Sequence, residues 1–143
     1  MRFWDSSAVV PILTEETASA ECRKLLRTDP VLMVWCLTRT ELLSALWRRD
    51  RTSAADGALV QAAELRLDRL AVRWTEIDAV LPVRDGAERL LRIHSLGAAD
   101  ALQLAAALVA VDARPRRRHF VTLDEPLARA ARAEGFEVIR PGR

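Results

Sequence analysis

The sequence predicts an α/β fold in which helices flank a short, parallel, five-stranded sheet. Short apolar runs alternate with longer segments of helical periodicity, which is typical of a parallel sheet with helical connections. The run at 31–36 holds no polar residue, as expected of a strand that is buried on both faces. The chain of 143 residues has the length of one domain with a sizeable core. We therefore expect a single domain over residues 1–143.

The expected strands are short and are bounded by acidic or turn-forming residues. The first run ends at Asp5, the third at Asp78 and the fourth at Asp124. Gly135 ends the helix that precedes the last strand, as glycine commonly does. The five strands are expected at residues 2–4, 31–36, 71–75, 120–123 and 136–139.

Every connection between strands is expected to be helical, with two helices in each of the longer connections. Asp29-Pro30 stops the second helix, and residues 50–52 break the third. Pro82 falls in the first turn of a later helix, where proline is tolerated. The segment 98–111 is apolar nearly all round, which predicts a buried helix. The expected helices are one that passes through Val10, Ile12 and Leu13, one that holds Glu15 to Arg27, one that ends near His94, and those at 38–49, 53–69, 98–111 and 126–133.

Several classes of protein are disfavoured by composition and motifs. The longest uncharged apolar stretch, 101–111, falls short of the ~20 residues that a membrane-spanning helix needs. Asp5 lies where a signal peptide has its apolar region, so we expect a cytoplasmic protein that does not contact a membrane. Neither GxGxxG nor GxxxxGK[ST] occurs, which disfavours a nucleotide-binding module.

A receiver domain or an aspartate-based phosphatase is also disfavoured. Such a site needs a second acid beside Asp5 and a nearby lysine, whereas the sole lysine, Lys24, lies far from any expected strand end. Cys22 and Cys36 lie in apolar periodic stretches without CxxC spacing. Both are therefore expected to be buried, reduced thiols.

Four acidic residues fall where the carboxyl ends of parallel strands meet. Asp5 and Asp124 end the first and fourth strands. Glu41 and Asp100 lie in the first turns of two helices. If the first and fourth strands are neighbours, the four carboxylates converge above one edge of the sheet.

Each of the four acids also has an alternative explanation as a helix-capping residue. Asp5 and Asp124 fit N-caps. Glu41 forms a capping box with Thr38, and Asp100 is favourably placed near a helix N-terminus.

Taken together, the four carboxylates predict a metal site. An unpaired charge at Asp100, in an otherwise apolar helix, costs several kcal/mol to bury. No lysine or arginine is expected on the same face. Mg²⁺ and Mn²⁺ prefer carboxylate oxygens, waters and phosphates. Two such ions about 4 Å apart would activate water and stabilise the leaving oxygen of a phosphoryl displacement.

Four segments of the chain carry a resemblance to a known family. They are Asp5-Ser6-Ser7-Ala8, Thr40-Glu41-Leu42, the stretch from Ala99 to Ala105, and Val121-Thr122-Leu123-Asp124 followed by Leu127, Ala128 and Ala131. In their order and spacing these segments resemble the PIN-domain nucleases. They are most similar to the ribonuclease toxins of VapBC toxin-antitoxin pairs.

This resemblance implies a PIN-like three-layer sandwich and a Mg²⁺- or Mn²⁺-dependent endoribonuclease. Such proteins are usually homodimers, and a small antitoxin inhibits them by placing its C-terminal segment in the active site. Asp5 and Asp100 would be the principal metal ligands. Glu41 and Asp124 would complete the catalytic and metal-binding cluster.

The resemblance also identifies supporting residues and two departures from the family pattern. Ser7 and Thr122 match positions whose hydroxyl groups hydrogen-bond to the ligands. Gln103 stands where many relatives have histidine. Glu125-Pro126 follows Asp124 where a basic or polar pair is commoner, and this bears on the position of the Asp124 side chain.

Other features leave alternatives open. The segment from Arg114 to His119 either holds RNA phosphates or forms a solvated loop. His94 and His119 are not expected to be general bases, because neither follows a strand. Leu43 and Trp47, spaced i, i+4, suit a dimer contact. Two alternative functions remain at this stage: a non-catalytic PIN-like RNA-binding or protein-interaction module, and a housekeeping PIN nuclease.

Overall fold

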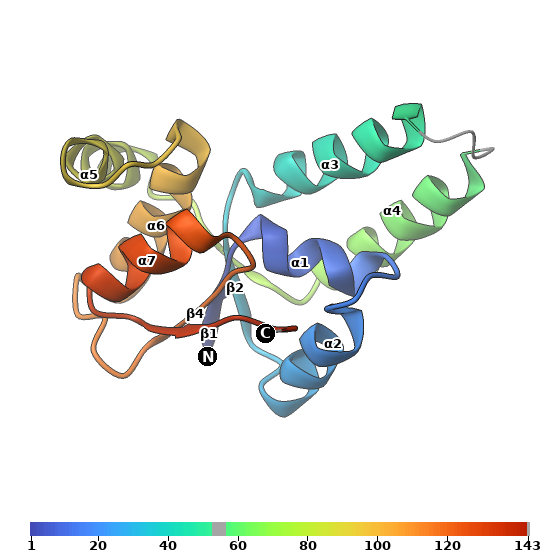
Figure 1. The fold of residues 1–143 in the computed structure, drawn as a ribbon, viewed down its shortest axis with the longest axis horizontal. Helices are drawn as coiled ribbons and strands as arrows, with labels where there is room; N and C mark the ends of the chain where they lie inside the picture. The colour runs from blue at the N-terminus through green and yellow to red at the C-terminus, as the bar shows by residue number, and fades with distance from the viewer. Residues whose placement is uncertain (53–56, 143) are drawn as a thin grey trace.

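A five-stranded sheet forms the middle layer of the protein (Figure 1). The computed structural model describes residues 1–52 and 57–142. Every strand pairs in parallel, in the order β3-β2-β1-β4-β5. The strands are β1 (Arg2–Trp4), β2 (Leu32–Trp35), β3 (Thr75–Ile77), β4 (His119–Val121) and β5 (Glu137–Ile139). The predicted α/β class and the parallel pairing are confirmed.

The strand order reverses between β1 and β4. From β1 the chain passes outward to β2 and β3, and then returns to the other side of β1 to form β4 and β5. The central register pairs Arg2 with both Leu32 and His119. In open α/β sheets, ligands bind beyond the carboxyl ends of the strands at such a reversal point. The fold therefore directs attention to the residues that follow β1 and β4.

Helices cover both faces of the sheet and bury separate cores. On one face α5, α6 and α7 pack on Phe3, Met33 and Phe120. On the other face α1, α3 and α4 pack on Trp4 and Val34. The alternation of side chains along a strand explains why adjacent residues such as Phe3 and Trp4 enter different cores. The helices are α1 (Ser6–Leu13), α2 (Ser19–Thr28), α3 (Thr38–Thr52), α4 (Ala58–Ala71), α5 (Val80–Ile93), α6 (Ala98–Ala110) and α7 (Glu125–Ala133).

The strand expected at 71–75 is misplaced. Helix α4 continues through Ala71, and β3 begins only at Thr75. Because β3 is an edge strand, its Thr75 and Glu76 are exposed and Ile77 is only half-buried. Such a strand lacks the apolar run by which a central strand is found. Strands β2 and β5 are shorter than expected, and β4 begins one residue earlier than expected, at His119, and ends two residues earlier, at Val121.

Helix α3 extends further than expected. Residues 50–52, taken as a break, are its last residues. The Arg49 guanidinium forms an ion pair with Glu16 on the neighbouring segment, so the C-terminal half of α3 has support beyond the main core. The first four residues of the helix expected at 53–69 lie outside the described residues. The described part of that helix starts at Ala58.

The cysteines differ in their surroundings. Both are free thiols, but only Cys22 is buried, whereas Cys36 is partly exposed at the end of β2. The expectation of two buried thiols is therefore wrong for Cys36. Burial raises the pKa of the Cys22 thiol to about 11, so it stays protonated near neutral pH.

No single helix within residues 1–52 and 57–142 combines the length and apolar composition that a membrane span requires. Only α5 and α6 taken together, bent by 120° at their junction, pass that test by length and composition.

The burial of α6 predicts the effect of truncating its core side chains. Leu104 is fully buried in α6, so Leu104→Ala would leave a cavity and lower the free energy of unfolding by ~2–5 kcal/mol. Urea denaturation would measure this change. Leu91→Ala is the control, because that side chain is 43% exposed. Equal losses in the two variants would contradict the packing described for α6.

Candidate active site

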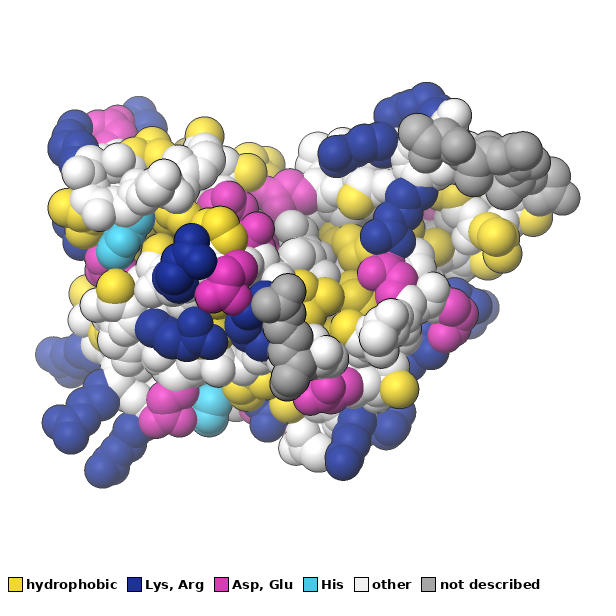
Figure 2. Space-filling view, in the orientation of Figure 1, with side chains coloured by type: hydrophobic (Ala, Val, Ile, Leu, Met, Phe, Trp, Pro, Cys, Tyr) yellow, Lys and Arg dark blue, Asp and Glu magenta, His cyan; other side chains and the backbone are white. Residues whose placement is uncertain are grey.

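The four predicted carboxylates lie at the carboxyl edge of the sheet, around the reversal point. Asp5 directly follows β1 and caps α1, and Asp124 follows β4 and caps α7. Glu41 and Asp100 lie in the first turns of α3 and α6. Because β1 and β4 are neighbours, the condition for convergence is met. Figure 2 shows acidic side chains gathered in the hollow between the two groups of helices.

Asp5 is the most enclosed of the four and is held by a dense set of hydrogen bonds. Its side chain is only 3% exposed. Its Oδ2 accepts hydrogen bonds from the Ser7 amide at 3.2 Å, from the Ser7 hydroxyl and from Thr122 Oγ1 at 2.9 Å. Burial raises the pKa of Asp5, these hydrogen bonds lower it, and the nearby Glu41 charge raises it, with a net upward shift.

The same hydroxyl groups connect Asp5 to the segment that carries Asp124. Ser7 Oγ accepts a hydrogen bond from the Leu123 amide at 2.9 Å. Thr122 Oγ1 accepts one from the Asp124 amide at 3.0 Å. The two hydroxyl oxygens are 3.2 Å apart. These contacts agree with the supporting roles that the sequence suggested for Ser7 and Thr122, and they fix the loop after β4 relative to Asp5.

Asp100 lies within electrostatic reach of two of the other acids. Its side chain is half-buried. Burial is the main cause that raises its pKa, and the charges of Asp124 and Asp5 raise it further, whereas a hydrogen bond from the Gly97 backbone lowers it. The structure therefore places Asp100 close enough to Asp5 and Asp124 for both of their charges to disfavour its ionised form.

The Glu41 carboxylate accepts a hydrogen bond from the buried side chain of Gln103 in α6. Gln103 Nε2 donates to Glu41 Oε2 at 2.8 Å and to Thr38 Oγ1 at 3.1 Å. Gln103 is only 1% exposed, and its Oε1 has no hydrogen-bond partner among the described residues. A buried acceptor without a donor costs ~1–3 kcal/mol. Gln103 thus donates a hydrogen bond to the Glu41 carboxylate while its own carbonyl oxygen stays unpaired. Unpaired buried polar atoms of this kind are found at functional sites.

The Glu125-Pro126 departure leaves Asp124 in position. Pro126 occupies the first turn of α7, and Asp124 Oδ1 accepts a hydrogen bond from the Leu127 amide at 2.7 Å. Glu125 forms ion pairs with Arg140 and Arg129. Its charge is thus balanced outside the acidic cluster.

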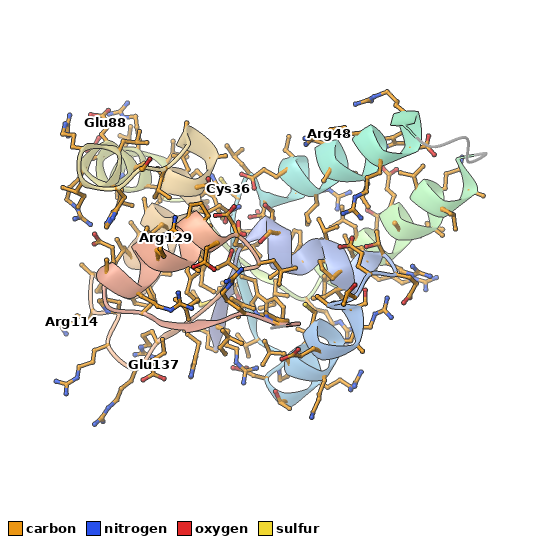
Figure 3. The ribbon with its side chains drawn as sticks, viewed as in Figure 1. Cys36, Arg48, Glu88, Arg114, Arg129 and Glu137 are labelled. Carbon is orange, nitrogen blue, oxygen red and sulfur yellow. The ribbon has the colours of Figure 1, made fainter. Side chains whose placement is uncertain are left out.

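Arg140 is a supporting residue that the sequence did not single out. Besides its ion pair with Glu125, its Nη2 donates to the Leu123 carbonyl oxygen at 3.0 Å. It therefore holds the loop that carries Asp124 from the side of β5. Since Arg140 lies 15 residues beyond Glu125, no local pattern in the sequence marks it. Figure 3 shows Arg129, the other ion-pair partner of Glu125, on α7.

Other candidate residues lie apart from this edge. His94 forms a hydrogen bond with Glu134 at 2.8 Å, and His119 lies 3.3 Å from Glu137. Both histidines are thus paired with glutamates away from the four carboxylates. Leu43 is half-buried and Trp47 is 38% exposed, so α3 displays the pair that suited a dimer contact.

The donor set suits a hard divalent cation, although the side chains do not surround a single point. Among the described residues, no three His, Cys, Asp or Glu side chains are close enough together to hold an ion. Asp5 and Asp124 both repel the charge of Asp100. No arginine, lysine or histidine in residues 1–52 and 57–142 forms an ion pair with any of these three acids. Carboxylate oxygens with uncompensated charge are the ligands that Mg²⁺ and Mn²⁺ favour.

The raised pKa of Asp100 predicts that its charge destabilises the metal-free protein. Because the folded chain retains this proton above the ordinary value of 3.8, the resulting stabilisation is complete at lower pH and is lost as pH rises through the raised value. Asp100→Asn should therefore raise Tm at pH 7 by a few degrees in EDTA, as measured by circular dichroism. Asp85→Asn, at an exposed site on α5, is the control. A lower Tm for Asp100→Asn would contradict the repulsion.

The fold matches solved structures, and the sequence matches a family model, over most of the chain. A comparison with curated protein sequences finds no match. The structure is similar to PAE2754 from Pyrobaculum aerophilum, with a TM-score of 0.68 and 21% identity over 96% of this chain and 87% of that one. It is also similar to FitAcB from Neisseria gonorrhoeae, with a TM-score of 0.65 and 19% identity over 99% of this chain and 98% of that one. The sequence profile of the PIN domain matches residues 2–133, and the chain therefore belongs to the PIN-domain family.

Proposed function

We propose that the protein is a Mg²⁺- or Mn²⁺-dependent endoribonuclease and the toxin of a type II toxin-antitoxin system. PIN domains are generally nucleases. The observation that carries the proposal is the group formed by Asp5, Asp100 and Asp124 at the reversal point of the sheet. Within it, burial and then the charges of Asp124 and Asp5 raise the pKa of Asp100. Keeping carboxylates together without a protein cation lowers stability, and a bound divalent cation would offset this cost.

Asp5 and Asp100 would be the principal ligands, with Glu41 and Asp124 completing the cluster. When bound, the cation would supply a nucleophilic water at neutral pH and stabilise charge on the phosphoryl oxygens. Ser7 and Thr122 hold Asp5 by donating to its Oδ2. The proposed reaction cleaves an RNA phosphodiester bond and leaves a 5′-phosphate and a 3′-hydroxyl, as the resemblance to VapBC toxins implies.

The partners in this proposal come from the same resemblance. An antitoxin would inhibit the enzyme by placing its C-terminal segment at the acidic cluster, and the active form would be a homodimer. The exposed Trp47 beside Leu43 on α3 supports a contact between two copies of the chain. RNA is the proposed substrate.

Removing single carboxylates tests the proposed chemistry. Asp5→Asn and Asp100→Asn should each reduce the rate of RNA cleavage by on the order of 100-fold or more, because each removes a charged ligand. The measurement compares both variants with wild type on a structured RNA in Mg²⁺, in Mn²⁺ and in EDTA. Asp85→Asn should cut normally. Equal cutting by all the proteins, or cutting that persists in EDTA, would refute a metal-dependent nuclease.

The Gln103 bridge predicts a loss of activity without a loss of stability. Gln103→Met keeps the length of the side chain but removes the donor to Glu41 and also the unpaired Oε1. We expect kcat to fall by ~10–100-fold and Tm to be unchanged or higher. Gln103→His, which restores a ring N–H donor, should recover part of the rate. Gln61→Met, at an exposed position in α4, is the control, and unaltered kcat in Gln103→Met would refute the role of the bridge.

A further inference from the structure

We propose that the loop between α6 and β4 is a second RNA-binding surface, distinct from the acidic site. We call its four exposed arginines, Arg114, Arg116, Arg117 and Arg118, the arginine loop. The proposal rests on the proposed function, since it assumes that RNA is the substrate.

The arginine loop lies at the opposite edge of the sheet from the carboxylates. It directly precedes β4, and His119 pairs with Arg2 at the amino end of β1 and with Glu137 at the amino end of β5. Asp5 and Asp124 follow the other ends of β1 and β4. In Figure 1 this loop joins the base of β4, far from the N-termini of α1 and α7, and Figure 3 places Arg114 on the same outer side.

The charges of the arginine loop are not balanced within the protein. In the described part of the chain, none of its four guanidinium groups forms an ion pair, whereas Arg39 pairs with Asp68 at 2.7 Å and Arg89 with Glu134 at 2.6 Å. Two acids lie close by in the sequence or the sheet: the exposed Asp112 and Glu137, which is 3.3 Å from His119. The local excess is therefore positive, and dark blue side chains project from this corner in Figure 2.

The backbone of the loop is held in a defined and costly conformation. Asp112, Ala113 and Arg117 have φ values of 49°, 53° and 61°, in the left-handed region that costs an L-residue roughly 1–2 kcal/mol. Hydrogen bonds retain it: the Ala113 amide donates to Leu108 O at 2.8 Å and the Arg118 amide to Pro115 O at 2.8 Å. Strained backbone of this kind persists where the surrounding structure imposes it, and it is concentrated at functional sites.

Closely spaced, unpaired arginines match the repeating phosphates of a nucleic acid. The guanidinium group binds phosphate in a bidentate manner, and each neutralised phosphate adds affinity that weakens with salt. An RNA chain must pass around the sheet to reach both edges. A domain of this length has a radius of gyration of ~15 Å, so the path requires about ten nucleotides. A long or folded RNA can therefore contact the acidic site and the arginine loop together, whereas a short oligonucleotide contacts only one of them at a time.

Direct binding tests this proposal without requiring cleavage. In an Asp5→Asn background, the four loop arginines are changed to glutamine together, and binding to RNAs of about 30 and about five nucleotides is followed by fluorescence anisotropy over a range of salt concentrations. The matched control replaces Lys24, Arg27, Arg69 and Arg73, all exposed on or beside α2 and α4, with glutamine. Both variants change the net charge equally.

We expect the loop variant to bind the long RNA at least ~10-fold more weakly and to lower the salt slope by about 3, since four single-strand contacts contribute ~0.7 each. The loss of affinity should be smaller for the short RNA, which cannot contact the arginine loop and the acidic site together. In the catalytically intact chain, KM for the long RNA should rise while kcat is retained. Changing the same arginines to lysine, which preserves the charge and guards against a folding defect, should retain most of the affinity.

Two results would overturn the proposal. An equal loss in the matched control would show that net charge alone governs binding. Unchanged affinity and salt slope for the long RNA would also refute the proposal. The arginine loop would then be a candidate binding surface for an acidic protein instead. The proposed function fails separately. If wild type does not cleave RNA, or if Asp5→Asn and Asp100→Asn cleave as fast as wild type, the metal-dependent nuclease site is refuted, whereas the anisotropy measurement involves no turnover.

Discussion

The constraint on which the site depends is the burial of the Asp5 carboxylate at the end of the central strand. At 3% exposure this side chain is almost removed from water, and an isolated charge there would be strongly disfavoured. The protein compensates with hydrogen bonds from the Ser7 amide and hydroxyl and from the Thr122 hydroxyl. The pKa nevertheless remains raised, so the compensation is incomplete.

The hydrogen bonds that hold Asp5 also determine where Asp124 lies. Ser7 and Thr122 each donate to Asp5 and accept from an amide of the segment after β4. A shift of that segment would therefore break contacts to the buried carboxylate. Arg140 holds the same segment from the opposite side through Leu123 O. The hydrogen bonds that hold the buried Asp5 thus also determine the position of the partly exposed Asp124.

The sequence was enough to predict the site residues whose position follows from the local secondary structure. Asp5 and Asp124 could be found because a residue that ends a strand and begins a helix has a predictable place at the sheet edge. Gln103 was noticed only as a departure from the family pattern, since its bridge to Glu41 joins residues 62 positions apart. β3 was misplaced because an edge strand needs no apolar run. Long-range pairing and edge exposure leave no periodic signal, and this is why these features required the structure.

The helices that begin at the carboxyl edge explain why the acids are tolerated there at all. Each helix N-terminus has the equivalent of roughly half a positive charge, and Asp5 and Asp124 cap α1 and α7 directly. These partial charges favour ionised carboxylates but fall off within one turn. They do not cancel the burial and the repulsion from Asp124 and Asp5 that together raise the pKa of Asp100. Four helix N-termini are thus enough to bring the acids together, while the remaining negative charge creates the demand for a cation that the proposed chemistry requires.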